Sequence, residues 1–246
     1  MNLDKTHMKG PSILSCASIL DCHKQRRFAP GEMIYTMGDN QDGVWQVLDG
    51  YVGLRVYTLS GEVVLLRLVN RRGLFGSRSF LTDKPRSCCA QAISPVTLRH
   101  LPASQLNRMM EREPGFEHAL LLTMAEAFRD AHDRILSISV YSARTRFLRL
   151  CAEWAADEGI ETPPAGFSVR LPIPYQDIAQ ILSISPETMS RTVHRLHEDG
   201  VITMAGRHIT ISAGWIACCE TETSGGPIEK RLPRSGSYPK NMLLFG

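Results

Sequence analysis

Turn residues recur at short intervals between Phe28 and Leu101, and they divide this part of the chain into short segments. The segments between the turns are rich in β-branched and aromatic residues, as in VWQVL and YVGLRVYTL. The turn signals are Pro30-Gly31, Gly38-Asp39-Asn40, Asp42-Gly43, Asp49-Gly50, Ser60-Gly61 and Arg72-Gly73. Strands that repeat at about 8–12 residues, with turns between them, predict a small barrel or roll.

A helical pattern replaces the strand pattern after Pro114, a residue that suits the first turn of a helix. Apolar residues then recur in steps of three and four from Phe116 to Ile138. A single core rarely needs so long an apolar row, and a long helix of this kind usually lies between two bodies, such as two subunits. We therefore predict a dimerisation helix over 114–141, with an ordinary buried helix as the alternative.

Two short helices and a hairpin are expected further along the chain. YQDIAQIL at 175–182 is amphipathic, 183–185 form a turn, and Pro186 begins the next helix. Residues 201–211 then form a two-stranded hairpin. Helix, tight turn, helix and hairpin together make a winged helix-turn-helix, which we place over 142–212. An ordinary amphipathic surface helix is the alternative for the segment that begins at Pro186.

The front of that second helix carries side chains suited to reading DNA. The N-terminal residues of such a helix meet base edges in the major groove, and Glu187, Ser190 and Arg191 lie on one helical face. Arginine offers a donor fork that matches the two acceptors of guanine, and a carboxylate accepts from the amine of cytosine. Ser185 and Thr188 place hydroxyls at the helix start, where phosphates are favoured.

The composition is that of an ordinary globular protein, with 43% apolar and 22% charged residues in a chain of 246. No apolar run approaches the roughly 18 residues that a membrane span requires, and the N-terminus lacks a long apolar segment before a cleavage site. We therefore expect a cytoplasmic protein with no membrane partner. The residues from 213 to 246 are rich in Gly, Pro, Ser and charge, and we expect a flexible tail without a packed core.

Several motifs occur in an order typical of one protein family. The first is FAPGEMIYTMGDNQDGVWQVLDGYVGL, the second is LFG at 74–76 followed by PRS at 85–87, and the third is QDIAQILSISPETMSR. Together they resemble the cyclic-AMP receptor/FNR (CRP/FNR) family of bacterial transcription regulators, over most of the chain before the tail. The resemblance implies an α+β fold: a leader and N-terminal β-roll of the cyclic-nucleotide-binding type (a double-stranded β-helix) within 1–113, the long dimerisation helix, and the C-terminal winged helix-turn-helix.

The resemblance also implies partners and DNA contacts. It implies a homodimer with two recognition helices about 34 Å apart that read a palindrome in double-stranded DNA, and it makes RNA polymerase an expected partner. The family's E-x-x-S-R pattern is matched by Glu187, Ser190 and Arg191, in the version of the FNR and FixK branch, which reads TTGA-type half-sites. The positions expected to hold DNA phosphates are Gln176, Ser185, Thr188 and Arg207.

The family's cyclic-AMP pocket is only partly retained. It needs a glutamate for the ribose, an Arg-Ser pair for the cyclic phosphate and a Thr-Ser pair for adenine. Arg86 and Ser87 match the phosphate pair, but Ser77 stands in place of the glutamate. Ala131 and His132 align with the adenine pair. We therefore expect no dependence on cyclic AMP, and Arg86 could instead be a solvated loop residue or part of a salt bridge.

Other effectors have few candidate ligands in the sequence. An iron–sulfur sensor of the FNR type needs four cysteines, whereas only Cys16 and Cys22 precede the first strand. A haem would need axial ligands. The candidates are His23, His100, His118 and His132. We expect neither an iron–sulfur cluster nor a haem, we predict no metal site, and the effector remains unidentified at this stage.

Seven cysteines, an odd number, indicate reduced thiols rather than a disulfide framework. Cys88 and Cys89 are adjacent in a predicted strand, so alternation requires one of them to face outward. Cys151 lies on a further predicted helix, ARTRFLRLCAEWAADEG, in the first part of the region 142–212. These three are the candidates for a redox switch, and the alternative is that they are small structural residues.

Two functions compete at the level of sequence. The first is a sequence-specific DNA-binding transcription regulator. The second is a cyclic-nucleotide or other small-effector binding module that acts on a protein partner, and the intact recognition face argues against it. The sequence shows no nucleophile–base constellation, metal-ligand spacing or phosphate-cradling glycine loop, so we predict no catalytic residue and no enzyme activity.

Overall fold

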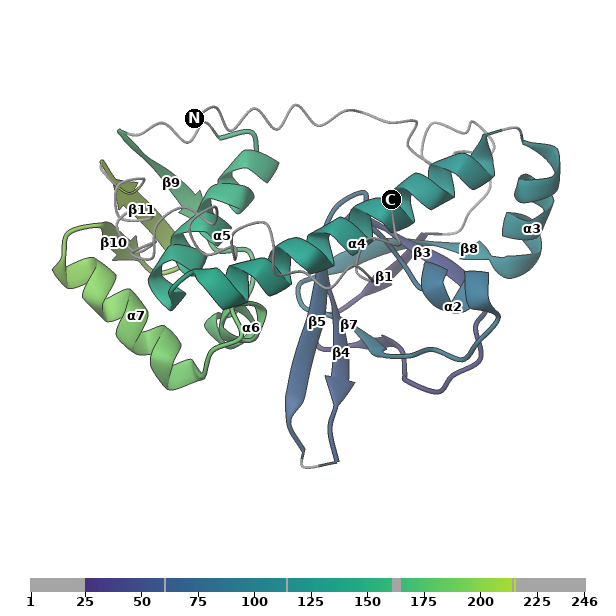
Figure 1. Cartoon of the computed structure of the whole chain (residues 1–246), viewed down its shortest axis with the longest axis horizontal. Coiled ribbons are helices and arrows are strands. Elements are labelled where there is room, and N and C mark those ends of the chain that lie inside the picture. Colours follow the sequence, from purple (N-terminus) through teal and green to yellow (C-terminus); the bar gives the residue numbers. More distant parts are fainter. Residues whose placement is uncertain (1–24, 60, 114, 161–164, 214, 216–246) are drawn as a thin grey trace, which may run out of the picture. The chain divides into compact units, whose positions relative to one another are not determined.

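The computed structural model describes residues 25–213 and Trp215, except positions 60, 114 and 161–164 (Figure 1). The chain divides into two compact units. The described part of the first unit comprises residues 25–136 and 172–186, and that of the second comprises the remainder. The expected leader with its two cysteines, His23 and nearly all of the expected tail lie outside the described residues.

The first unit contains two four-stranded antiparallel sheets that together form a β-roll (Figure 1). In spatial order, one sheet consists of β1 (Gln25–Phe28), β8 (Val96–Pro102), β3 (Gly43–Asp49) and β6 (Leu74–Phe75). The other consists of β2 (Met33–Tyr35), β7 (Cys89–Ala92), β4 (Val52–Tyr57) and β5 (Val63–Val69). The roll predicted from the turn spacing is therefore confirmed.

Strand β3 shows how the alternation of side chains builds two cores from one sheet. Trp45 and Val47 point into a core that includes residues of both sheets, where the Trp45 ring lies 6.0 Å from Phe28 and 6.5 Å from Phe75. Val44, with the opposite parity, packs into a second core made with helices. Successive side chains of a strand face opposite sides of the sheet, and residues 43–47 are all buried. Strand β3 is therefore covered on both faces, and its buried residues do not alternate with exposed ones.

The helices that follow or interrupt the strands of the β-roll come before α5 (Ala143–Asp157) in the chain. They are α2 (Ser77–Thr82), α3 (Ala103–Arg112) and α4 (Phe116–Val140), the last of which extends into the second unit. The first turns of α4 bury Phe116, Ala119 and Leu120 in the second core, beside Leu106 and Met109 of α3.

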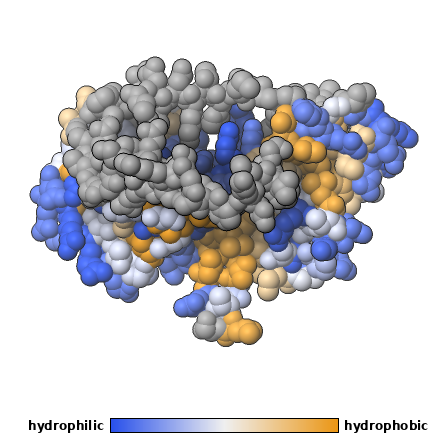
Figure 2. Space-filling view, in the orientation of Figure 1, coloured by the Kyte–Doolittle hydropathy of each residue, from blue (hydrophilic) through white to orange (hydrophobic). Residues whose placement is uncertain are grey.

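The hairpin formed by β4 and β5 exposes several apolar side chains, and part of its surface is hydrophobic in Figure 2.

The second unit joins helices to a three-stranded sheet. Its elements are α5 (Ala143–Asp157), β9 (Gly166–Arg170), α7 (Pro186–Glu198), β10 (Ile202–Ala205) and β11 (His208–Ser212), with Pro186 itself counted in the first unit. The strand order is β10-β11-β9. The sequence analysis predicted no strand at β9, which pairs with β11 in register from Arg170↔His208 to Gly166↔Ser212.

The turn after α6 (Tyr175–Ile181) is closed by two hydrogen bonds within the first unit. The amide of Ser183 donates to the carbonyl of Gln180 at 3.1 Å, and that of Ile184 donates to Ala179 at 3.0 Å. Ser183 adopts φ of 54°, in the left-handed region. This conformation is costly for a residue with a Cβ and most costly for a β-branched one.

A pair of substitutions at Ser183 should therefore separate this backbone effect from loss of the serine hydroxyl. We expect Ser183→Val to be about 1–2 kcal/mol less stable than Ser183→Gly, because glycine has no Cβ penalty at positive φ. The free energy of unfolding from urea titrations measures this. The same two substitutions at Ser190, an exposed position inside α7, should give the opposite order, since glycine is the poorer helix former. Equal stabilities at position 183 would contradict the assigned turn conformation.

Candidate functional site

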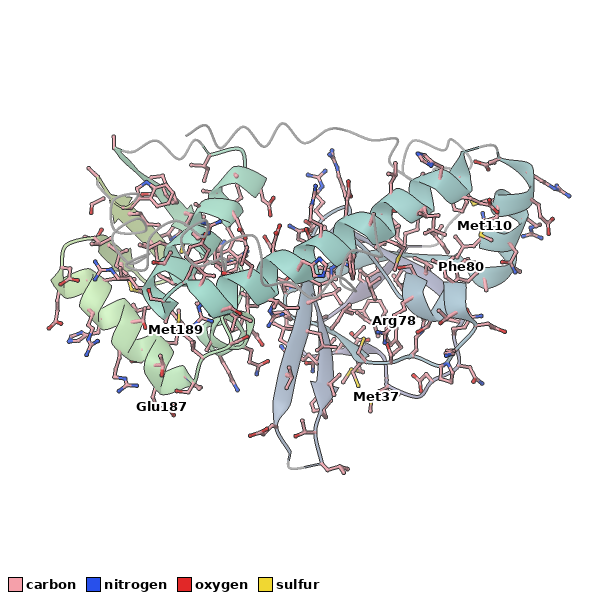
Figure 3. The ribbon with its side chains drawn as sticks, viewed as in Figure 1. Met37, Arg78, Phe80, Met110, Glu187 and Met189 are labelled. Atoms are coloured by element: carbon pink, nitrogen blue, oxygen red, sulfur yellow. The ribbon has the colours of Figure 1, made fainter. Side chains whose placement is uncertain are left out.

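The α7 helix separates a buried face from an exposed one. Met189 and Leu196 are buried, whereas Glu187, Ser190 and Arg191 are exposed. Figure 3 labels Glu187 on the outer side of the helix and Met189 on its inner side. The three residues expected to read bases therefore share the accessible face near the N-terminus of one helix.

Hydroxyl groups of α7 orient the recognition face, by which we mean the exposed side chains of Glu187, Ser190 and Arg191. The guanidinium of Arg191 donates through Nη2 to the hydroxyl of Thr188 at 3.3 Å, one turn earlier. The hydroxyl of Thr192 in turn donates to the Thr188 carbonyl at 2.7 Å. A guanidinium has five N–H donors, so the bond to Thr188 orients Arg191 and leaves donors for a two-acceptor partner such as a guanine edge.

The side chains expected at DNA phosphates come from three places. Gln176 belongs to α6 and Ser185 to the turn that follows it, and both are exposed. Thr188 is half-buried in the first turn of α7. Arg207 is exposed at the tip between β10 and β11, where its carbonyl accepts from the amide of Leu171 at 2.8 Å. Their contacts with DNA remain a prediction.

An ion pair between Arg144, at the start of α5, and Asp199, just after α7, was missed by the sequence reasoning. The pair joins the two ends of these helices within the second unit and so supports the end of the recognition helix. The two residues are 55 positions apart, and neither belongs to a motif that the sequence analysis recognised. No local pattern could have indicated their contact.

The candidate effector pocket centres on Arg86, which is buried: its side chain is 1% exposed. Nη1 donates to the Gly76 carbonyl at 3.0 Å, and Nη2 donates to the Gly43 carbonyl at 2.9 Å and to the carboxylate of Asp42. The guanidinium also lies over the Tyr35 ring, 4.5 Å from its centroid. Of the two alternatives to a phosphate contact, the solvated loop residue is therefore wrong and the salt bridge is present.

Asp42 uses both carboxylate oxygens. One accepts from Arg86, and the other lies 3.2 Å from Nε2 of His100. The contact with His100, and then that with Arg86, lowers the pKa of Asp42 to about 2, against the opposing effect of partial desolvation. Asp42 therefore remains ionised at neutral pH. The sequence analysis recognised Asp42 only as part of a turn, and His100 only as a haem candidate.

The other residues of the expected pocket lie in different surroundings. Ser77 is buried at the start of α2, and its hydroxyl donates to the sulfur of Met124 in α4 at 3.1 Å. Ser87 is exposed. Ala131 and His132 are exposed on α4, and the His132 ring lies 4.2 Å from that of Phe128. Within the described residues, the polar groups gathered around Arg86 are thus Asp42 and two carbonyls rather than Ser77 or His132.

Comparison with known proteins identifies the class to which this arrangement belongs. A model of the cyclic nucleotide-binding domain matches residues 25–113, and a model of the Crp-like helix-turn-helix domain matches residues 145–213. The cyclic AMP receptor protein of Thermus thermophilus is 29% identical over 181 residues, which are 73% of this chain and 80% of the relative. The global nitrogen regulator of Synechococcus elongatus is 26% identical over 188 residues, 75% of this chain and 84% of the relative.

The chain belongs to the CRP/FNR family of transcription regulators. Among solved structures, FixK2 from Bradyrhizobium japonicum has a similar fold, with a TM-score of 0.67 at 22% identity over 78% of this chain and 93% of that one. This CRP/FNR protein is accordingly a DNA-binding transcription regulator, a class without enzyme activity. In the part of the chain that the structure describes, no helix is both long and apolar enough to cross a bilayer.

The cysteines of this CRP/FNR protein differ in their surroundings. Within the described residues, Cys88, Cys89 and Cys151 are free thiols. Cys88 is half-buried, while Cys89 is buried and its sulfur accepts from the Met37 amide at 3.3 Å. Burial raises the pKa of both Cys88 and Cys151. Since the thiolate is the reactive form, burial of this kind disfavours a redox role, which remains a hypothesis.

Potential metal ligands do not gather in the described residues, where no group of three or more His, Cys, Asp or Glu side chains could hold an ion. Of the histidines considered as haem ligands, His100 faces Asp42, while His118 and His132 are exposed. The two N-terminal cysteines and His23 lie outside the described residues.

Proposed function

We propose that this CRP/FNR regulator acts as a homodimer that reads a palindrome of TTGA-type half-sites and does so without cyclic AMP. The observation that carries the proposal is the joint exposure of Glu187, Ser190 and Arg191 on one face of α7, with Arg191 oriented by Thr188. Side chains four residues apart lie on one face of a helix, so Glu187 and Arg191 can approach the same base pair. The RNA polymerase partner belongs to the same proposal, as does a place in the cytoplasm, where the DNA is.

The chemistry of the face fits the one G·C pair in each TTGA half-site. The Arg191 fork matches O6 and N7 of guanine, and the Glu187 carboxylate can accept from the cytosine amine. Half-sites read by a two-fold dimer are centred about ten base pairs apart, so two four-base half-sites leave about six base pairs between them. The proposed target is therefore TTGA-N6-TCAA.

Binding of the purified chain to this duplex, compared with a scrambled duplex of equal length, tests the proposal. We expect tight, salt-dependent binding to the palindrome and weaker binding to the scrambled DNA, with no added effector. A small-effector module that acts on a protein partner would bind both duplexes equally weakly. That result would remove the proposed function.

The dimer is supported by an apolar row on α4 in the first unit. Leu121, Phe128 and Ile135 are 69%, 64% and 63% exposed, although all three are large and hydrophobic. They are seven residues apart, the spacing that places side chains along the seam of two supercoiled helices. Exposed apolar rows of this kind mark association surfaces. We assign the row to the contact with a second copy of α4.

Cyclic AMP is expected to bind weakly, because three groups that it needs are replaced or engaged. Arg86 is already paired with Asp42, Ser77 supplies no carboxylate to the ribose, and Ala131 offers no side-chain hydrogen bond to the base. Each lost hydrogen bond to a charged group costs about 1.5–3 kcal/mol. Isothermal titration measures the affinity directly. A dissociation constant near about 1 μM, or −8 kcal/mol, together with cyclic-AMP-dependent DNA binding, would contradict the proposal.

A further inference from the structure

Arg86 carries a charge that the fold buries. A buried guanidinium is stable only when it is paired and hydrogen-bonded, and here the counter-charge comes from Asp42, 44 residues earlier in the chain. Yet the pairing is incomplete. The Nε of Arg86 is buried and has no hydrogen-bond partner among the described residues. The site thus offers an anion one more donor than the carboxylate of Asp42 uses.

Asp42 reaches this site from the solvent side. Its own side chain is 55% exposed, while that of Arg86 is 1% exposed, so the carboxylate covers the guanidinium as an incoming anion would. The approach depends on Gly43, whose φ is 135° and where a Cβ would lie 2.1 Å from the Leu101 carbonyl oxygen. Gly76 is under a similar constraint, since a Cβ there would lie 2.4 Å from Nη1 of Arg86. Both glycines let main-chain carbonyls close around the guanidinium.

Main-chain hydrogen bonds tie the segment before Asp42 to the segment of Arg86. The Arg86 amide donates to the Asp39 carbonyl at 2.8 Å, and the Gly38 amide donates to the Arg86 carbonyl at 2.8 Å. On the far side, the Ala103 amide donates to the Asp42 carbonyl at 3.0 Å. The carboxylate is therefore held beside Arg86 by the backbone on both sides, and its second oxygen lies 3.2 Å from Nε2 of His100.

We propose that Asp42 is a built-in occupant of the effector's anion site, so that its carboxylate takes the place on Arg86 that a phosphate group would otherwise take. The anion site of the β-roll is then filled by a side chain of the same chain, and a phosphate-bearing molecule must displace Asp42 before it can bind. An intramolecular group competes at a high effective concentration and loses no translational freedom on binding. This inference rests on, and deepens, the proposed independence from cyclic AMP, since it names the residue that blocks the site.

Asp42→Asn in the full-length chain tests the inference, because it removes the charge and keeps the shape of the side chain. In chloride, we expect this variant to unfold at a lower temperature than the wild type, since Arg86 loses its counter-charge. Added inorganic phosphate should restore its unfolding temperature, at an apparent affinity on the order of 100-fold tighter than in the wild type. Chloride at equal ionic strength serves as the salt control, and cyclic AMP is titrated in a separate arm.

The double variant Asp42→Asn with Arg86→Met is the matched control, because it removes both charges and should not respond to phosphate. If Asp42→Asn folds only in phosphate, the inference is supported. If Asp42→Asn responds to phosphate no more than the wild type does, Asp42 does not occupy an anion site. The same conclusion follows if Asp42→Asn fails to fold in either salt while the double variant folds. Tight cyclic-AMP binding by the wild type would instead overturn the proposed function, so the two failures are distinguishable.

Discussion

The substitution Arg191→Ala is expected to lower the affinity for the TTGA-N6-TCAA duplex by about 1–3 kcal/mol in each half-site. A symmetric dimer meets two half-sites, so the whole complex should lose about 2–6 kcal/mol. The reason is that the exposed guanidinium, which Thr188 orients, is the group that matches the two acceptors of guanine. Fluorescence anisotropy on the palindrome and on a scrambled duplex, at several salt concentrations, measures the loss. Binding to scrambled DNA should change little.

Arg195 supplies a matched control within the same helix. It is also exposed, but it lies one turn further from the N-terminal end that approaches the bases. Arg195→Ala should weaken binding to both duplexes by similar amounts and reduce the salt dependence, as expected for a phosphate contact. Replacing the G·C pair by A·T should penalise the wild type more than Arg191→Ala, which has already lost the guanine contact and keeps only the contact of Glu187 with cytosine. Equal losses for Arg191→Ala on specific and scrambled DNA would mean that Arg191 touches only phosphate.

The β-roll could be predicted from the sequence because its information is local. Turn residues, β-branched segments and their spacing can be recognised in the sequence without knowing which strands pair. Strand β9 was missed for the same reason. Only Phe167 and Val169 face the core in a five-residue strand. Its partner β11 lies about 40 residues later. With so short an alternation, and two prolines just before it, the segment is equally compatible with a loop.

The recognition face could also be predicted, because a helix fixes which residues share a side. The side chain that pairs with Arg86 in the effector pocket could not be predicted. Arg86 matched a phosphate-binding position in sequence, but its actual partner is Asp42, a residue of a turn 44 positions earlier. An arginine has the same sequence signature whether a ligand or the chain itself neutralises it. Only the tertiary contact distinguishes neutralisation by a ligand from neutralisation by the chain, and here the contact is with a residue of the chain.

Aspartate at Ile135 is expected to convert the dimer into monomers and thereby remove most specific DNA binding. Ile135 belongs to the heptad-spaced row on α4, so in a two-fold dimer the substitution places two carboxylates in or near one apolar seam, where burial of unpaired charge is strongly unfavourable. A monomer retains one recognition helix and loses the contacts of the second half-site. Sedimentation equilibrium measures the mass, and anisotropy on the palindrome measures the binding.

Arg129→Gln is the control for this experiment, because it changes the net charge of α4 by the same amount at an exposed position outside the row. It should remain dimeric and bind the palindrome nearly as well as the wild type, whereas Ile135→Asp should lose both properties together. Circular dichroism of both variants separates loss of association from loss of folding. A dimeric Ile135→Asp variant would place the subunit interface elsewhere on the molecule. A monomeric variant with undiminished palindrome binding would instead remove the requirement for two recognition helices.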